Sequence, residues 1–214
     1  MCPSKLKTSG NKRKIWKAKN LDKTMDRDHN LYSYVVRVDN GFAPNPERRL
    51  CTLACCKPGI RKKAKVGDWL IGTGSKKHKA RFKLIYAMKI TEKMPFEDYF
   101  TKKCKYKNRK DQIYDFDKKN NRFKIIENKE LYGHDNMNAL INDRKGQYVL
   151  ISDKYYYFGE NALGIRGYRR IVKKGPNCKK FNINDVIVKK ILGLIKSDKT
   201  GKRGEPLDLL KEQC

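Results

Sequence analysis

The sequence predicts an α+β domain in which a small curled β-sheet or β-barrel is flanked by short helices and followed by a C-terminal helix. Three observations predict this class. Short segments rich in aromatic and β-branched residues alternate with polar turns. The helical patterns between these segments are short. The last pattern, DVIVKKILGLIK at residues 185–196, is longer and strongly amphipathic.

The 214 residues are enough for one domain with one hydrophobic core. Residues 1–29 are predicted to form a basic, largely disordered arm, because lysine and arginine outnumber their few large apolar groups. Residues 30–196 are the predicted domain. Residues 197–214 are predicted to be a glycine-rich C-terminal tail.

In the first half of the domain, LYSYVVRV at residues 31–38 has the density of apolar and aromatic side chains typical of a buried strand. PGIRKKAKV at residues 58–66 predicts a short helix with proline near its start. WLIGTG at residues 69–74 and LIYAMKI at residues 84–90 predict two adjacent antiparallel strands.

In the second half, PFEDYF at residues 95–100 predicts the start of a helix, and IYDFD and RFKIIENK at residues 113–129 predict two short strands. QYVLISDKYYYFG at residues 147–159 predicts two more strands around a Ser152–Asp153 turn. Side chains alternate along a strand, so one face of the YYYF run is expected to point away from the core. Asn182 or Asn184 is expected to cap the last helix. Its predicted apolar face contains Val186, Ile187, Ile191, Leu194 and Ile195.

The charge balance predicts a polyanionic partner. The chain carries 52 basic and 23 acidic side chains, a net charge of +29. Nucleic acid is the expected partner, ahead of an anionic membrane surface. No apolar run approaches the ~20 residues of a membrane span, and the basic start lacks the apolar segment of a secretory signal. With seven cysteines, an odd number, these features predict a cytoplasmic protein with reduced thiols and no membrane association.

Metal and cofactor sites are not expected. Cys51 and Cys55 have a permissible C-x₃-C spacing, but the sequence offers no second ligand pair, so Cys55 and Cys56 are expected to be buried thiols. The GTGSKK run lacks the spacing of a nucleotide-binding P-loop, although Ser75, Lys76 and Lys77 can hold one phosphate of a polymer.

The sequence patterns that would indicate catalytic residues are weak. His134–Asp135 is the one histidine pair of interest, and Asp111, Asp115 and Asp117 could form a carboxylate cluster for Mg²⁺. A charged loop is the simpler interpretation of the aspartates. No motif for a nucleophile turn stands beside a histidine.

Four blocks of this sequence resemble the nucleotide modification associated domain 2 family. They are YSYVVRVDNGFAPNP at residues 32–46, CTLACCKPGIRKKAKVGDWLIGTGS at 51–75, LIYAMKITEKMPFEDYF at 84–100 and VLISDKYYYFG at 149–159. The resemblance implies association with DNA-modification enzymes. VGDWLIGTGS and the strand after it also resemble the PUA, EVE and ASCH group, which implies a PUA-like barrel with a cleft for RNA or modified bases.

Two departures separate this chain from the family pattern. KDQIY at residues 110–114 stands where relatives have a GDNIY-like block, and FKIIENKELYGHDN replaces an expected stretch rich in histidine and serine. If catalysis in the family depends on those polar residues, this chain binds without reacting.

The leading hypothesis is therefore a non-catalytic nucleic-acid-binding module, associated with DNA modification, that recognises a modified or flipped base in an aromatic-lined cleft. Alternatives are a nucleotide- or base-modifying enzyme or nuclease, which would use Asp111, Asp115, His134 or the cysteines, and a structural RNA-binding protein. The residues expected to contact the base are Trp69, Tyr86, Tyr157, Asn40, Thr73 and Ser75. Those expected to hold phosphates are Lys76, Lys77, Arg169 and Arg170.

Overall fold

The computed structural model describes residues 28–76, 80–101, 106, 108–126 and 132–208. The basic arm predicted for residues 1–29 lies outside this part of the chain except for Asp28 and His29. Lys77 and the last six residues of the predicted tail also lie outside it.

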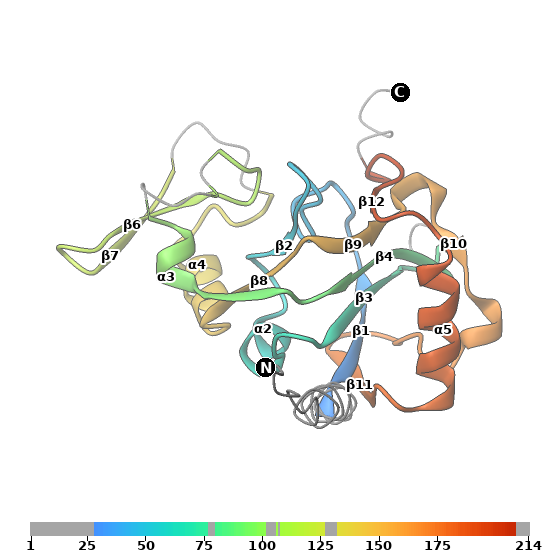
Figure 1. Cartoon of the computed structure of the whole chain (residues 1–214). Coiled ribbons are helices and arrows are strands. Elements are labelled where there is room, and N and C mark those ends of the chain that lie inside the picture. Colours follow the sequence, from blue (N-terminus) through green and yellow to red (C-terminus); the bar gives the residue numbers. More distant parts are fainter. Residues whose placement is uncertain (1–27, 77–79, 102–105, 107, 127–131, 209–214) are drawn as a thin grey trace, which may run out of the picture.

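A seven-stranded sheet forms the centre of the molecule (Figure 1). Its order is β11-β1-β3-β4-β9-β12, with β10 also paired to β4. β1 and β3 run parallel, whereas β3 and β4 are the antiparallel neighbours that the sequence predicts. The strands are β1 (Asn30–Val36), β3 (Trp69–Gly74), β4 (Lys83–Lys89), β9 (Lys154–Tyr157), β10 (Leu163–Gly164), β11 (Cys178–Asn182) and β12 (Gly201–Lys202).

A second sheet and a hairpin complete the β-structure. The second sheet has the order β2-β8-β5, and β6 pairs with β7. The strands are β2 (Cys51–Leu53), β5 (Glu92–Pro95), β6 (Tyr114–Asp117), β7 (Arg122–Ile125) and β8 (Tyr148–Ser152). The helices are α2 (Pro58–Lys63), α3 (Phe96–Tyr99), α4 (Met137–Arg144) and α5 (Val186–Lys196), with short 3₁₀ turns η2 (Gly159–Asn161) and η3 (Arg166–Tyr168).

The predicted α+β class is confirmed, but the sheets do not close into a barrel. In the described part of the chain no pairing joins the end strands β11 and β12, so the large sheet stays open. β8 and β9 follow one another in sequence yet belong to different sheets. The strands are thus divided between two sheets.

Both faces of the large sheet are covered. Trp69, Ile71 and Tyr156 pack in one core against α5, whereas Tyr86 and Tyr157 pack in a second core on the other face, with side chains of α2 and β8. All four side chains of the YYYF run are consequently buried, and the expectation that one of its faces points away from the core is wrong. α5 lies to the right of the sheet and α3, α4 and the β6–β7 hairpin lie to the left (Figure 1).

Helix α5 is present, but its buried face differs from the predicted one. Val188, Ile191, Leu192 and Ile195 are buried, at the i, i+3, i+4, i+7 spacing of one helical face. Val186 is 67% exposed and Leu194 37% exposed. The helix carries apolar residues on more than one side, so pattern alone does not fix its orientation. Its N-cap is Asp185, which accepts a hydrogen bond from Ile187 N (3.0 Å), rather than either predicted asparagine.

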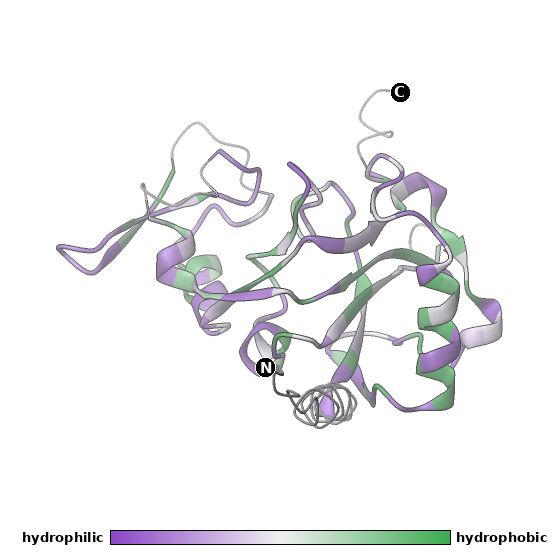
Figure 2. Ribbon diagram, viewed as in Figure 1, coloured by the Kyte–Doolittle hydropathy of each residue, from purple (hydrophilic) through white to green (hydrophobic). Residues whose placement is uncertain are grey.

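The predicted tail contains a docked segment. β12 pairs with β9, and the backbone N–H of Leu207 donates to Asp39 Oδ2 (3.1 Å). Hydrophobic residues follow the central strands and α5, whereas the β6–β7 hairpin is hydrophilic (Figure 2). None of the helices in the described ranges is both long and apolar enough to cross a bilayer.

Candidate functional site

The turn between β2 and α2 holds Cys56 in an uncommon backbone conformation. Cys56 and Lys57 have φ angles of 62° and 44°, in the left-handed region that side chains other than glycine rarely adopt. Pro58 then opens α2, where its missing N–H costs nothing. The chain thus passes from a strand through a sharp turn into a helix, and the Cys56 side chain is half-buried at the turn rather than fully buried as expected.

Cys56 faces a histidine that is held by a buried carboxylate. Cys56 Sγ lies 3.5 Å from His134 Nε2, and His134 Nδ1 lies 2.7 Å from Asp143 Oδ2. Asp143 belongs to α4, whose N-cap Asn136 accepts from Ala139 N (3.0 Å). Thiol, imidazole and carboxylate therefore form a linear Cys-His-Asp arrangement from three separate segments.

Asp143 is fixed by more than its histidine. It is fully buried, and its Oδ1 accepts from the backbone N–H of Cys56 (2.8 Å) while Oδ2 also accepts from the Tyr114 hydroxyl (3.0 Å). The guanidinium of Arg61 lies 3.7 Å from the carboxylate and donates through Nε to Cys56 O (2.8 Å). Both backbone polar groups of Cys56 are thus held by buried side chains, which stabilises its left-handed conformation.

The titration behaviour of His134 and Asp143 suits acid–base chemistry. Burial lowers the pKa of His134, but the hydrogen bonds to Asp143 and Cys56 outweigh this effect and raise it to about 10. Burial raises the pKa of Asp143, whereas the hydrogen bond and charge of His134 and the charge of Arg61 lower it below the ordinary value. At neutral pH this pair is an imidazolium next to a carboxylate, so both ring nitrogens of His134 are donors.

The thiol opens into a cavity of about 400 Å³, called here the thiol cavity. Its walls combine aromatic, cationic and amide side chains. Phe42 stacks on Tyr132, with ring centroids 4.7 Å apart, and packs against His134. The lining residues include Tyr34, Arg37, Asn40, Phe42, Cys56, Lys57, Tyr132 and His134.

The family model of nucleotide modification associated domain 2 matches residues 28–213. The chain belongs to this family. The match confirms the resemblance predicted from the sequence and associates the chain with nucleotide modification. No curated protein and no solved structure matches the chain significantly.

In this family member, Cys55, His134 and Asp143 also meet the geometric requirement of a metal site. One donor atom from each lies within 4.8 Å of the others. Two facts weigh against this use. Burial raises the pKa of the Cys55 thiol well above its ordinary value, and a metal ligand must be a thiolate. The oxygens of Asp143 already accept hydrogen bonds from Cys56 N, Tyr114 and His134.

The residues predicted to contact a base fall into different parts of this family member. Asn40 lines the thiol cavity. Tyr86 and Thr73 lie behind it. The Tyr86 and Tyr34 hydroxyls share a hydrogen bond (2.7 Å), and the Thr73 hydroxyl donates to the Tyr34 carbonyl (3.2 Å). Tyr157 is fully buried and donates to Asp39.

Trp69 and Ser75 are separated from that group. Trp69 lies in the core on the opposite face of the sheet, against Tyr156. Ser75 is buried just after β3, and its hydroxyl lacks a hydrogen-bond partner within the described residues. The structure therefore does not bring Trp69, Tyr86 and Tyr157 to one cavity.

The predicted phosphate ligands also differ from one another. Lys76 is exposed after β3. Arg169 and Arg170 line a separate basic cavity, where Arg170 forms an ion pair with Asp185 (2.6 Å).

The carboxylates considered for Mg²⁺ do not form one cluster. Asp111 is buried, where it accepts hydrogen bonds from Thr52 and Tyr99 and lies 3.6 Å from Arg109 Nε. Asp115 and Asp117 line a cavity beside the β6–β7 hairpin. Asp111 thus has a structural role between β2 and α3.

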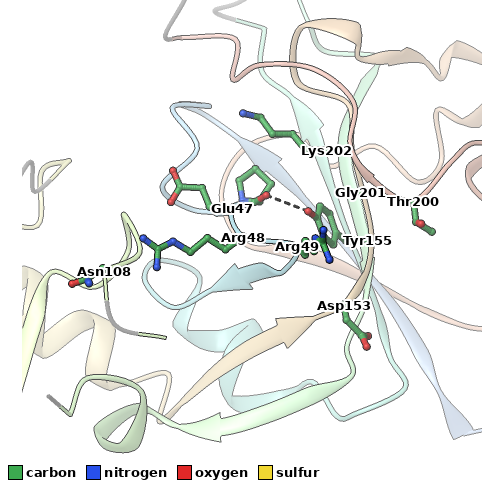
Figure 3. Close-up of a pocket in the computed structure, with 10 residues that line it drawn as sticks. Glu47, Arg48, Arg49, Asn108, Asp153, Tyr155, Thr200, Gly201 and Lys202 are labelled. Atoms are coloured by element: carbon green, nitrogen blue, oxygen red, sulfur yellow. Dashed lines mark hydrogen bonds between the residues drawn. The ribbon is translucent and has the colours of Figure 1, made fainter. Parts of the chain in front are cut away.

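A further cavity, of about 880 Å³, has walls of mixed charge (Figure 3). Arg48 and Arg49 occupy adjacent left-handed positions in the turn that precedes β2. Glu47 and Asp153 share the same cavity, and Tyr155 donates to Pro46 O (3.2 Å) at its base. Its described lining has no cysteine or serine nucleophile, so the thiol cavity is the stronger candidate for chemistry.

Sequence reasoning missed the partnership of Cys56 and Asp143 with His134. The sequence pairs His134 with Asp135, which is exposed and instead accepts from the Asn136 side chain (3.1 Å). A local signal exists, because Cys56 lies between an apolar strand and a Lys-Pro helix start. The sequence separation of 78 between Cys56 and His134 hides their contact from local sequence patterns.

Proposed function

We propose that this domain is a cysteine-dependent enzyme that acts on a nucleotide or nucleobase within a nucleotide-modification system. One observation carries the proposal: Cys56 Sγ lies 3.5 Å from His134 Nε2 at the wall of a cavity, and His134 is oriented by buried Asp143. A nucleophile beside a base that is held by a third group is the arrangement used for covalent catalysis on unrelated folds.

Each side chain has a defined part in the reaction. The Cys56 thiolate, beside the His134 imidazolium, bonds through Sγ to an electrophilic carbon of the substrate as the bond from that carbon to a nitrogen or oxygen leaving group breaks. His134 supplies the proton that the leaving group takes from Nε2. Water or an amine acceptor then displaces the sulfur and returns a proton to His134. Asp143 is a positioning residue, because it holds the imidazole without contacting the substrate.

The cavity walls support a nucleotide or nucleobase as substrate. Half-buried Tyr132, supported by the buried ring of Phe42, offers aromatic surface for a heterocycle. Arg37 and Lys57 add positive charge that complements a phosphate. Asn40 accepts from Phe42 N through Oδ1 (3.2 Å), which leaves its amide N–H groups for a base edge.

Thiol reactivity tests the proposal directly. We expect iodoacetamide to label Cys56 faster than Cys178, a half-buried thiol that serves as the matched control, in peptide mass mapping at neutral pH. His134→Gln should slow labelling at Cys56 only, because a cationic neighbour favours the nucleophilic form of a cysteine. Equal labelling of both thiols, unchanged by His134→Gln, would contradict the proposal.

Turnover provides the second measurement. With nucleotides and with modified or plain DNA, Cys56→Ala should abolish product formation, and His134→Gln should lower kcat by ~10²–10⁴-fold. The assay is run with and without divalent metal. Turnover that depends on metal and survives Cys56→Ala would replace the thiol mechanism with a metal-dependent one.

A second candidate function uses the same cavity without chemistry. The sequence predicts recognition of a modified or flipped base, and in this cavity Asn40 and Tyr132, stacked on Phe42, would provide it in place of the predicted aromatic residues. This function requires binding of modified DNA that is unaffected by Cys56→Ala, with no product formed. Equal affinity for plain RNA and modified DNA would instead favour a structural RNA-binding protein.

A further inference from the structure

A second cavity, called here the basic cleft, is lined by cations and by no acidic side chain of the described residues. Its volume is about 550 Å³. The cations are Arg81, Arg169, Arg170, Lys173, Lys174 and Lys179. Such a concentration of positive charge in a concave surface attracts polyanions by focusing the electrostatic field.

Phe82 stands in the basic cleft as a half-buried aromatic ring surrounded by guanidinium groups. The guanidinium carbons of Arg81, Arg166 and Arg169 lie 5.2, 5.8 and 5.8 Å from its ring centroid. An aromatic face within a cationic frame is the arrangement on which single-stranded nucleic acids stack their bases while their phosphates are neutralised.

Two of these arginines remain available to a ligand. Arg170 is paired with Asp185, whereas no carboxylate in the described ranges pairs with Arg81 or Arg169. Lys179 Nζ donates to Arg170 O (2.6 Å), an interaction that ties β11 to the segment after η3. One wall of the cleft is therefore fixed by this hydrogen bond, and two guanidinium groups can bind phosphates.

Strand register places the basic cleft and the thiol cavity at the same end of the large sheet. β1 and β3 are parallel, with Val36 opposite Gly74, and both end there. β4 is antiparallel to β3 and β11 is antiparallel to β1, so both begin at this end. Phe82 comes directly before β4, and Lys173 lies in the segment before β11. Arg37, which follows β1, lines the thiol cavity.

Positive charge continues between the two cavities. Lys57 lines the thiol cavity and Lys173 lines the basic cleft. Both charges act on Cys178 at the start of β11: burial raises the pKa of its thiol, and the charges of Lys63, Lys57 and Lys173 oppose that rise. A chain of phosphates could follow these lysines from one cavity to the other.

We propose that the basic cleft binds a single strand of nucleic acid, with one base stacked on Phe82 and phosphates held by Arg81 and Arg169, and that this strand leads to the thiol cavity. The substrate is then a polynucleotide rather than a free nucleotide. The route of the strand to the thiol cavity rests on the proposed function, whereas binding in the cleft does not.

Fluorescence anisotropy with a labelled single-stranded oligonucleotide tests the cleft. Phe82→Ala should weaken binding roughly 5- to 150-fold, as expected when one stacked base is released, whereas Phe82→Tyr should retain it. Arg81→Ala with Arg169→Ala should make the slope of log K against log salt shallower by ~0.7 for each phosphate that is no longer neutralised. The matched control, Lys119→Ala with Arg122→Ala, removes two exposed charges at the β6–β7 hairpin, on the other side of the molecule (Figure 1), and should change binding little.

Competition identifies the ligand. Duplex DNA and heparin should compete less well than the single strand. Binding that is insensitive to Phe82→Ala, or that falls equally in the hairpin control, would overturn the proposal in favour of general attraction by net charge. Phe82→Leu, which keeps apolar packing against the core but removes the aromatic ring, should bind as weakly as Phe82→Ala, and native binding by Phe82→Leu would attribute the loss in Phe82→Ala to misfolding.

The two proposals fail differently. If the oligonucleotide binds in the cleft but Cys56 supports no turnover, the enzymatic proposal fails and the cleft stands. If free nucleotides turn over and oligonucleotides neither bind in the cleft nor react, the cleft proposal fails and the enzymatic proposal stands.

Discussion

At the scale of single residues, the candidate site depends on a strained backbone that its neighbours stabilise. A left-handed conformation costs a residue with a side chain ~1–2 kcal/mol, and Cys56 and Lys57 adopt it in succession. The Asp143 carboxylate and the Arg61 guanidinium hold the N–H and the carbonyl of Cys56. The side chains that position the thiol are therefore also those that support its conformation.

His134 makes the stability of the domain depend on pH. Its pKa rises from 6.5 to about 10 on folding, so its contribution is fully present below pH 6.5 and is lost as pH rises toward 10. We expect the difference in unfolding free energy between the native chain and His134→Gln to shrink between pH 6.5 and 10, as measured by urea denaturation. The other titratable groups are the same in both proteins, so their contributions to the pH dependence cancel in this difference. A difference that stays constant over this range would contradict a charged His134–Asp143 pair.

At the scale of elements, Arg61 joins α2 to α4 and β8. Its side chain is fully buried and donates to Cys56 O, to Tyr148 O (2.8 Å) and to Asp143 O (2.5 Å). Gly146 allows this approach, because a Cβ there would lie 2.5 Å from the guanidinium carbon. One side chain thus satisfies carbonyls from three segments.

Replacement of Arg61 tests that junction. We expect Arg61→Met to lower the unfolding free energy by ~3–5 kcal/mol, because the buried Asp143 charge and three carbonyls are left without this donor. The matched control is Lys62→Met, one residue along α2 and exposed, which should change stability by no more than ~0.5 kcal/mol. Chemical denaturation measures both. Similar small decreases in the two variants would show that the junction is not critical.

The elements differ in how far the sequence predicts them. β3 and β4 carry continuous apolar runs bounded by glycine or basic loops, and both form as predicted. Helix α4, with the sequence MNALINDR, is not among the helices that the sequence predicts. That helix forms because Asn136 caps it and because Leu140 and Asp143 are buried against other segments.

At the scale of the whole molecule, hydrogen bonds over long sequence separations hold the sheet, the loop after β1 and the C-terminal segment together. Asp39 accepts from the Tyr157 hydroxyl and from Leu207 N, and its own N–H donates to Asp208 Oδ2 (2.6 Å). Asp39 precedes Asn40 of the thiol cavity. The docked C-terminal segment thereby supports one wall of the candidate site.

Tyr157→Phe tests this connection. We expect it to lower the unfolding free energy by ~1.5–3 kcal/mol, because a donor to a buried carboxylate is removed. Tyr156→Phe is the matched control: its ring packs in the other core, and its hydroxyl meets no acceptor among the described residues. It should change stability by less than ~0.5 kcal/mol. Equal effects would show that the Asp39 hydrogen bond contributes little.

The sequence by itself determined the family, the α+β class, the central strands and the excess of positive charge, because these depend on local composition and alternation. The tertiary structure decided that the sheets stay open, which face of α5 is buried, and that Cys56, His134 and Asp143 meet. These features depend on contacts between segments far apart in the chain. Local pattern indicates which segments become strands and helices, but it does not specify which of their side chains come together.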